Sequence, residues 1–193
     1  IELTDHLRCP AEHPEQFLVL LPDRMNGRLV ATGHLGCPIC GLTWEVQEGI
    51  LDFGGGTPAP APTALTPDGA HALLGLEGPG GYVALFGQAT TLAEGLAALL
   101  PGVRFVLVNP MDGMEDSEIA SVVRSSRSPL KRASMRGVVL GEDVTADARW
   151  VEEAIGAVLP GLRAVGAGGP APAIDGFTLM AESAGGWVGK RGK

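Results

Sequence analysis

The sequence predicts a two-part α/β protein, in which a small N-terminal zinc ribbon precedes a mostly parallel sheet that ends in a C-terminal hairpin. Three observations favour this fold class. All three cysteines lie within the first 40 residues, and a segment rich in glycine, proline and alanine, GGGTPAPAPTAL, follows them. Beyond this segment, short apolar runs alternate with helical patterns, as in βαβ units. We expect a zinc ribbon over 1–53, a flexible linker over 54–65 and an α/β domain over 66–193.

The cysteines follow a pattern that is typical of a structural zinc site. Cys37 and Cys40 form a C-x2-C pair in CPICG, and Cys9 stands four residues before His13 in CPAEH. Structural zinc takes four tetrahedral ligands, mostly thiolate sulfur and imidazole nitrogen. The spacing therefore predicts that Cys9, His13, Cys37 and Cys40 bind one zinc ion.

For the fourth zinc ligand, His34 and His6 are alternatives to His13. Reduced thiols without metal are the plain alternative for the cysteines. A redox C-x2-C of thioredoxin type would need a surrounding βαβ pattern, which this part of the sequence lacks. A zinc ion held by four protein ligands has no open position, so we expect a structural role for it.

Charge and hydropathy restrict the class of protein. The formal net charge is −8, from 22 acidic and 14 basic residues, so a dominant nucleic-acid surface is not the first expectation. No run of 18 uncharged apolar residues occurs, and the N-terminal segment lacks the basic and apolar regions of a signal peptide. We therefore expect a cytoplasmic protein without a membrane span.

The α/β part predicts strands and helices in alternation. Buried strands are expected at Tyr82–Phe86, Arg104–Val108 and Gly137–Leu140, and residues 111–123 predict a short helix followed by a strand. Helices are expected from 67, 90 and 145 onward, with candidate caps at Asp68, at Thr90 or Thr91, and at Thr145; the last should end at Pro160-Gly161. Gly185-Gly186 should close the terminal hairpin.

Two segments of the first part, LTDHLRCP and LGCPICGLTWEVQEGILDF, resemble the small zinc-ribbon family that activates methyltransferases acting on tRNA, rRNA and release factors. Trp44, Val46, Gly49 and Ile50 take the places of an aromatic residue and an I-x-x-G-I ending in that family. The resemblance covers residues 3–53 and departs at CPAEH, where the family usually has a second C-x2-C. It implies a zinc-binding protein with a protein partner.

The order of elements over residues 66–190 resembles a trimmed class I S-adenosylmethionine (SAM) methyltransferase, which implies a Rossmann-like fold. Family members bind SAM on a glycine-rich turn after the first strand and bind its ribose through an acidic residue after the second. Here Gly87 stands in LFGQATT and Asn109 takes the acidic position, so these two are the candidate cofactor residues. A further loop, 141–143, is a candidate substrate-facing segment, and no catalytic residue can be assigned.

A basic run gives the chain one more candidate function. It contains five of the 14 basic residues within 13 positions and no acidic residue: Arg124, Arg127, Lys131, Arg132 and Arg136. Such a run is typical of a phosphate-contacting loop, although a solvated loop is the plainer interpretation. The acids of 112–118 are interpreted in the same way, as a solvated helix start rather than a metal cluster.

We predict a non-catalytic, zinc-binding scaffold or partner-binding protein; the alternatives are an active SAM-dependent methyltransferase and an RNA-binding accessory factor.

Overall fold

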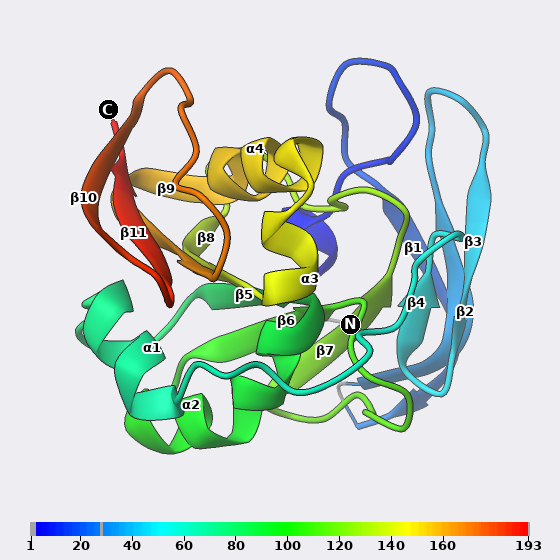
Figure 1. Cartoon of the computed structure of the whole chain (residues 1–193). Helices are drawn as coiled ribbons and strands as arrows, with labels where there is room; N and C mark the ends of the chain where they lie inside the picture. The colour runs from blue at the N-terminus through cyan, green and yellow to red at the C-terminus, as the bar shows by residue number, and fades with distance from the viewer. Residues whose placement is uncertain (1–2, 28, 193) are drawn as a thin grey trace.

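One continuous sheet runs through the computed structural model, which describes residues 3–27 and 29–192 (Figure 1). Its eleven strands follow the order β1-β2-β3-β4-β7-β6-β5-β8-β9-β11-β10. The ribbon supplies the first four, which pair antiparallel in chain order: β1 (Val19–Asn26), β2 (Leu29–Gly36), β3 (Thr43–Gln47) and β4 (Ile50–Asp52). A short turn of 3-10 helix, η1 (Thr4–His6), precedes them.

The remaining strands form the Rossmann-like part. They are β5 (Tyr82–Phe86), β6 (Arg104–Val108), β7 (Ala120–Arg124), β8 (Met135–Leu140), β9 (Val158–Ala167), β10 (Phe177–Ser183) and β11 (Gly186–Arg191). Counted from β5, their order is 3-2-1-4-5-7-6, whose first five members match the doubly wound dinucleotide-binding fold. Strands β7, β6, β5, β8 and β9 are parallel, and β11 runs antiparallel to both neighbours. The predicted fold class is confirmed.

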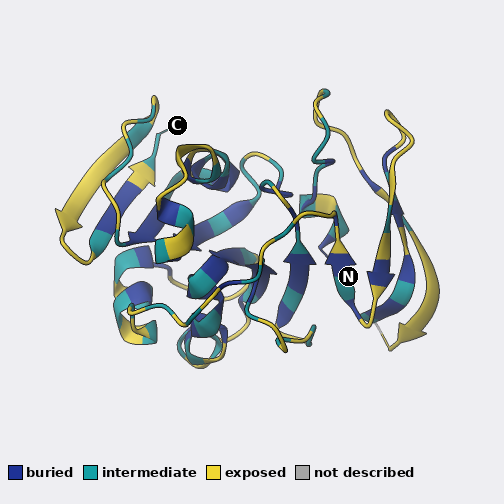
Figure 2. Ribbon diagram, turned by 45° about the vertical axis from the view of Figure 1, so that its right-hand side comes forward, coloured by how far each residue is buried: buried dark blue, intermediate teal, exposed yellow. Residues whose placement is uncertain are grey.

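Helices cover both faces of the parallel strands (Figure 1). Below the sheet lie α1 (Pro67–Leu74) and α2 (Ala93–Leu99), and above it lie α3 (Glu142–Thr145) and α4 (Ala148–Ala157). Along β5, Val83 and Leu85 pack with α1 and α2, while Ala84 and Phe86 pack with α4, as the two-residue period of a strand requires. Both faces of the central strands are therefore buried (Figure 2).

The helix caps predicted from the sequence are wrong in the first two helices. Thr66, not Asp68, caps α1: its hydroxyl accepts a hydrogen bond from the amide of Gly69 at 3.2 Å. Residues 87–92 form a 3-10 helix, η2 (Gly87–Leu92), instead of starting an α-helix. The hydroxyls of Thr90 and Thr91 donate back to carbonyls within this turn, so neither residue caps α2.

The third helix also differs from its prediction. A separate turn, α3, precedes α4, and Asp147 rather than Thr145 caps α4 by accepting hydrogen bonds from two amides. The segment from Val158 through Pro160-Gly161 belongs to strand β9, so the helix ends earlier than proline and glycine indicated. Residues 111–119 contain no helix, and β7 follows them directly.

The ribbon and the Rossmann-like part share one sheet and one core. Strand β4 pairs parallel with β7 through Leu51 opposite Val123, and an isolated bridge joins Leu7 to Leu130. Leu7, Leu51 and Leu130 are fully buried, in the same cluster as Phe86 of β5. The boundaries 1–53, 54–65 and 66–193 thus remain a prediction about which parts could fold alone.

The segment 54–65 lies along the carboxyl edge of the parallel strands rather than spanning open solvent. Ala59 donates its amide hydrogen to the carbonyl of Asn109, at the end of β6. Further along, the hydroxyl of Thr63 and the amide of Ala64 both donate to the carboxylate of Glu142 in α3. We call residues 54–65 the strap. Among the described residues, no helix has the length and apolar character needed to cross a membrane.

Candidate functional site

A cluster of three cysteines and one histidine lies at the end of the ribbon. The ligand atoms of Cys9, His13, Cys37 and Cys40 all fall within 4.8 Å of one another. The Cys9 and Cys40 sulfurs are 3.7 Å apart, and the Cys37 sulfur is 3.3 Å from Nε2 of His13. Two sulfurs at the corners of a tetrahedron around zinc would stand about 3.8 Å apart, given a Zn–S bond of about 2.3 Å. The group could therefore hold a zinc ion.

The surroundings of these side chains favour metal binding. His13 Nδ1 lies 2.7 Å from the Pro14 carbonyl, which orients the ring and leaves Nε2 facing the cysteines. Burial raises the pKa of the Cys9 thiol to about 12. Burial also opposes ionisation of Cys37, but hydrogen bonds from the backbone of Cys40 and Ile39 outweigh it and lower the pKa of Cys37 to about 7. A thiolate at Cys37 suits a first metal ligand.

The two alternative histidines lie outside the cluster. His34 is on the outer face of β2, where its Nε2 is 3.5 Å from a carboxylate oxygen of Asp23. His6 packs against the ring of Tyr82 in a tilted arrangement, with 4.7 Å between the ring centroids. Of the four histidines in the chain, His13 is the one whose ring faces the thiols.

The turn after β5, where the sequence resemblance places SAM, is filled by a carboxylate of the chain itself. Gly87 has φ +58, and a Cβ there would overlap both carboxylate oxygens of Asp143. The amide of Gln88 donates to Asp143 Oδ1 at 3.0 Å, and the amide of Asp143 donates to Gln88 Oε1 at 3.1 Å. The backbone donor that would face an anion at this turn thus already faces Asp143.

The second candidate cofactor residue, Asn109, is also engaged within the chain. Its Nδ2 donates to the Ser125 carbonyl at 2.8 Å, and its Oδ1 accepts from the Ser125 amide at 2.9 Å. Gly56 of the strap packs so closely that a Cβ there would overlap Asn109 Oδ1. Both ends of the amide are therefore used to tie β6 to the chain after β7, under the strap.

A cavity of about 410 Å³ remains between the strap, Phe86, Asp143 and Trp150. It lies at the carboxyl ends of β5 and β6, beside the switch point where open α/β sheets bind ligands. Asp143 belongs to the loop 141–143, which is predicted to face a substrate, but its contact with the turn after β5 was not predicted. Its position could have been deduced, because Gly141 follows the apolar strand β8 and the doubly wound order places β8 beside β5.

The basic run is divided among separate surroundings. Arg127 forms an ion pair with Glu153 at 2.6 Å, and Arg124 lies 3.5 Å from a carboxylate oxygen of Asp112. Farther on, Lys131 donates to the Asp5 carbonyl, and the Arg136 guanidinium donates to backbone carbonyls of residues 77–80. The acids of 112–118 lie outside any helix. No continuous basic face results from the run.

Comparisons with known proteins find only distant similarities, all of them to solved structures under 20% identical. No protein-family model matches it, and no curated protein matches its sequence. A solved complex between the Haloferax volcanii Trm112 methyltransferase activator and a methyltransferase is 19% identical, over 50% of this chain and 49% of that one, with a TM-score of 0.42. The CurJ carbon methyltransferase is 8% identical over 60% and 49%, with a TM-score of 0.42.

A third solved structure, the antibiotic-resistance methyltransferase Kmr, is 13% identical over 72% of this chain and 98% of that one, with a TM-score of 0.44. The chain spans about half the length of the first two matched chains. For this chain, the observed strand order and the Cys/His cluster establish a mixed α/β fold that carries a possible zinc site.

Proposed function

We propose that this chain is a non-catalytic, cytoplasmic, zinc-binding protein of methyltransferase descent that acts by binding a protein partner. The observation that carries the proposal is the closure of the cofactor turn by Asp143. A carboxylate beside Gly87 and a strap against Asn109 occupy the two places where the resemblance puts the methionine and ribose ends of SAM. The residues present therefore do not fit the cofactor, and a methyltransferase without SAM has no methyl donor.

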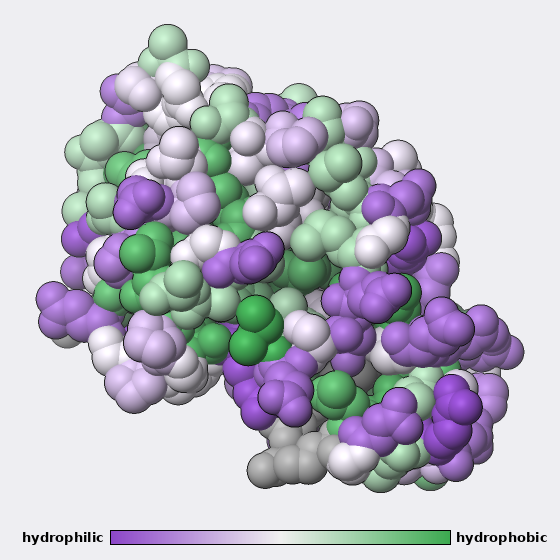
Figure 3. All heavy atoms as spheres, turned by 90° about the horizontal axis from the view of Figure 1, so that it is seen from below, coloured by the Kyte–Doolittle hydropathy of each residue, from purple (hydrophilic) through white to green (hydrophobic). Residues whose placement is uncertain are grey.

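Exposed apolar side chains on the ribbon support a protein partner. They stand on β1 and on the C-x2-C turn, and each is at least half exposed: Val19, Leu21, Ile39 and Leu42. Grouped apolar exposure of this kind marks interaction surfaces. Seen from below, the ribbon side is otherwise mostly hydrophilic (Figure 3). We infer that the partner docks on this apolar ribbon face, not on the β1 edge, where Pro22 and two register shifts interrupt the ladder.

The first test is a calorimetric titration of SAM and S-adenosylhomocysteine into zinc-loaded protein. We expect no binding heat up to about 1 mM ligand, because Asp143 and the strap occupy the places of the cofactor. A dissociation constant above about 1 mM means a binding free energy weaker than roughly −4 kcal/mol. Circular dichroism on the same sample checks that the protein is folded. A micromolar dissociation constant for either ligand would overturn the non-catalytic assignment and favour the methyltransferase alternative.

The second test addresses the partner. Leu21→Glu places a charge on the apolar ribbon face, and we expect it to release a partner that co-purifies with the wild-type chain. Leu179→Glu is the matched control, because Leu179 is also an exposed leucine but lies on β10, at the opposite edge of the sheet. Equal retention of the partner by both variants would contradict docking on the ribbon.

The RNA-binding alternative has less support. Arg124 and Arg127 pair with acids, and the chain carries a net charge of −8. The three remaining cations of the run, Lys131, Arg132 and Arg136, line one groove.

A further inference from the structure

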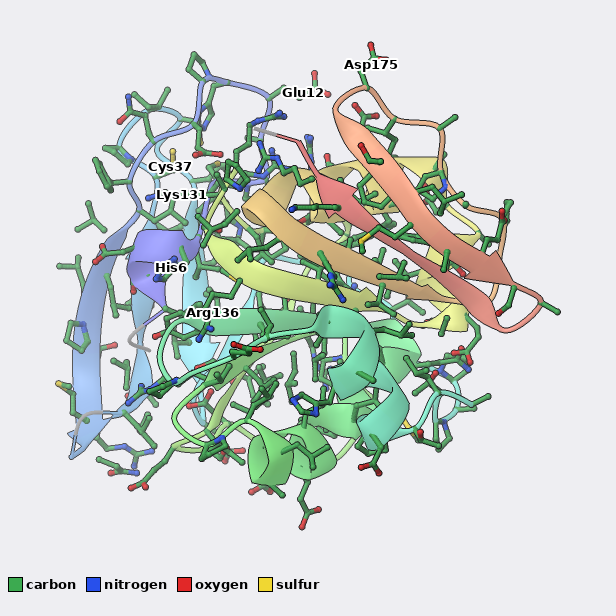
Figure 4. The ribbon with its side chains drawn as sticks, turned by 90° about the vertical axis from the view of Figure 1, so that its left-hand side faces the viewer. His6, Glu12, Cys37, Lys131, Arg136 and Asp175 are labelled. Carbon is green, nitrogen blue, oxygen red and sulfur yellow. The ribbon has the colours of Figure 1, made fainter. Side chains whose placement is uncertain are left out.

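A groove of about 610 Å³ lies between the ribbon and the amino ends of the parallel strands, on the side of the sheet opposite the strap. Its walls come from η1, from residues 15–17, from the start of β5 and from the segment leading into β8. Figure 4 shows Lys131, His6 and Arg136 in a row along this groove, with His6 between the two cations. The size is within the range of small-molecule sites, which is roughly 300–1,000 Å³.

The groove carries more positive than negative charge, although the Glu15 carboxylate accepts a hydrogen bond from the backbone amide of Arg132 at 3.1 Å. Lys131, Arg132 and Arg136 all line it, and within the described ranges none of the three forms an ion pair. The carbonyls that Lys131 and Arg136 contact orient them but leave their charge in place. Two acids, Asp5 and Glu15, also line the groove, so positive charge prevails there although the whole chain has 22 acids and 14 bases. Such a balance favours an anionic ligand.

Flat apolar surfaces stand beside these cations. The Phe17 ring is 66% exposed, and Lys131 Nζ lies 4.2 Å from its centroid. The mutually tilted rings of His6 and Tyr82 form another wall, and Leu159 adds an aliphatic contact. Burial lowers the pKa of His6, outweighing the opposite influence of Asp5, so this imidazole is neutral at pH 7 and can serve as a hydrogen-bonding group. Aromatic faces next to cations suit a planar base joined to a phosphate.

We propose that this groove binds a mononucleotide, with the phosphate held by Lys131 and Arg132 and the base against Phe17. Three observations carry the assignment: the volume, the unpaired cations and the exposed aromatic ring beside them. The site lies at the amino ends of the strands, away from the closed cofactor turn, so it does not depend on the proposed function. A phosphate alone would use only the cations, and a nucleoside alone would use only the rings.

The experiment is a set of calorimetric titrations with AMP, adenosine and inorganic phosphate as probes. We expect AMP to bind with a dissociation constant below about 1 mM, and adenosine and phosphate to bind at least tenfold more weakly, a difference of about 1.4 kcal/mol. A 5′-phosphorylated trinucleotide that binds as tightly as AMP would also support the site and identify an RNA end as its source. No AMP binding at about 5 mM by folded protein would overturn the proposal.

Variants separate the two halves of the site. Lys131→Met keeps the apolar stem and should weaken AMP at least tenfold, whereas Lys190→Met, on β11 away from the groove, should leave AMP binding unchanged. Phe17→Ser alters an exposed side chain that the core does not need, so it tests the base contact without threatening folding. It should weaken AMP and spare phosphate. AMP binding that neither Lys131→Met nor Phe17→Ser alters would overturn the assignment.

Discussion

Replacing Cys37 by serine should abolish stoichiometric zinc binding and lower the midpoint of thermal unfolding by roughly 10 °C or more. Zinc bound at a closed four-ligand site contributes directly to folding, on the order of 10 kcal/mol in isolated zinc-finger peptides. For a chain of this length, about 3 kcal/mol corresponds to roughly 10 °C. The cluster packs against the shared core, since Cys9 and Cys37 are both buried in it. Elemental analysis of zinc and a circular-dichroism melt measure the two effects.

His34→Ala is the matched control for the zinc prediction. His34 was an alternative fourth ligand, but its ring lies beside Asp23 on the outer face of β2. This variant should retain one zinc ion per chain and nearly the wild-type melting temperature. Loss of zinc from His34→Ala, or full zinc occupancy in Cys37→Ser, would contradict the ligand set Cys9, His13, Cys37 and Cys40.

Replacing Glu153 by alanine should destabilise the protein by about 3–5 kcal/mol, the usual cost of leaving partly buried charges without their partner. The Glu153 carboxylate lies 2.6 Å from Arg127 and 3.3 Å from Arg8, and it accepts a hydrogen bond from the Ser128 amide at 2.9 Å. The Glu153 side chain is 13% exposed and each of these two arginines 21%, so water replaces the lost contacts poorly. Urea unfolding measures the change.

The neighbouring Glu152 provides the control for this second substitution. It is exposed on the same turn of α4 and forms no ion pair among the described residues. Glu152→Ala should therefore change the free energy of unfolding by less than about 0.5 kcal/mol. Glu153→Gln should fall between the two, because it can keep the hydrogen bond from Ser128 but loses the charge. Equal effects of Glu152→Ala and Glu153→Ala would exclude a stabilising role for this carboxylate.

Elements with a local cause were predictable from the sequence. The apolar run at Tyr82–Phe86 formed the expected strand, and the predicted terminal hairpin forms, although its turn is Ala184-Gly185, because Gly186 is already the first residue of β11. The C-x3-H and C-x2-C pairs come together because each pair lies on one short turn. The prediction that the last helix ends at Pro160-Gly161 was wrong. These two residues lie within strand β9, which tolerates residues that normally end a helix.

Elements with a distant cause were not predictable in this way. Nothing local shows that Asp143 faces Gly87 or that Glu153 binds Arg8, since these contacts join residues 55 or more positions apart. The strap was predicted as a flexible spacer from its composition, but its amides and hydroxyls find partners at the ends of neighbouring strands. Composition describes how a segment behaves alone, whereas the sheet beneath it determines where the segment lies.

The pairing of β4 with β7 has a consequence for synthesis of the chain. Strand β4 leaves the ribosome about 70 residues before its parallel partner, a delay of roughly 4–14 s at 5–20 residues per second. Throughout that interval Leu51 has β3 on one side but no strand on the other, and Leu7 lacks its partner Leu130. The nascent ribbon thus exposes its inner apolar face for seconds. Early capture of zinc would hold its hairpins in order until β7 arrives to cover that face.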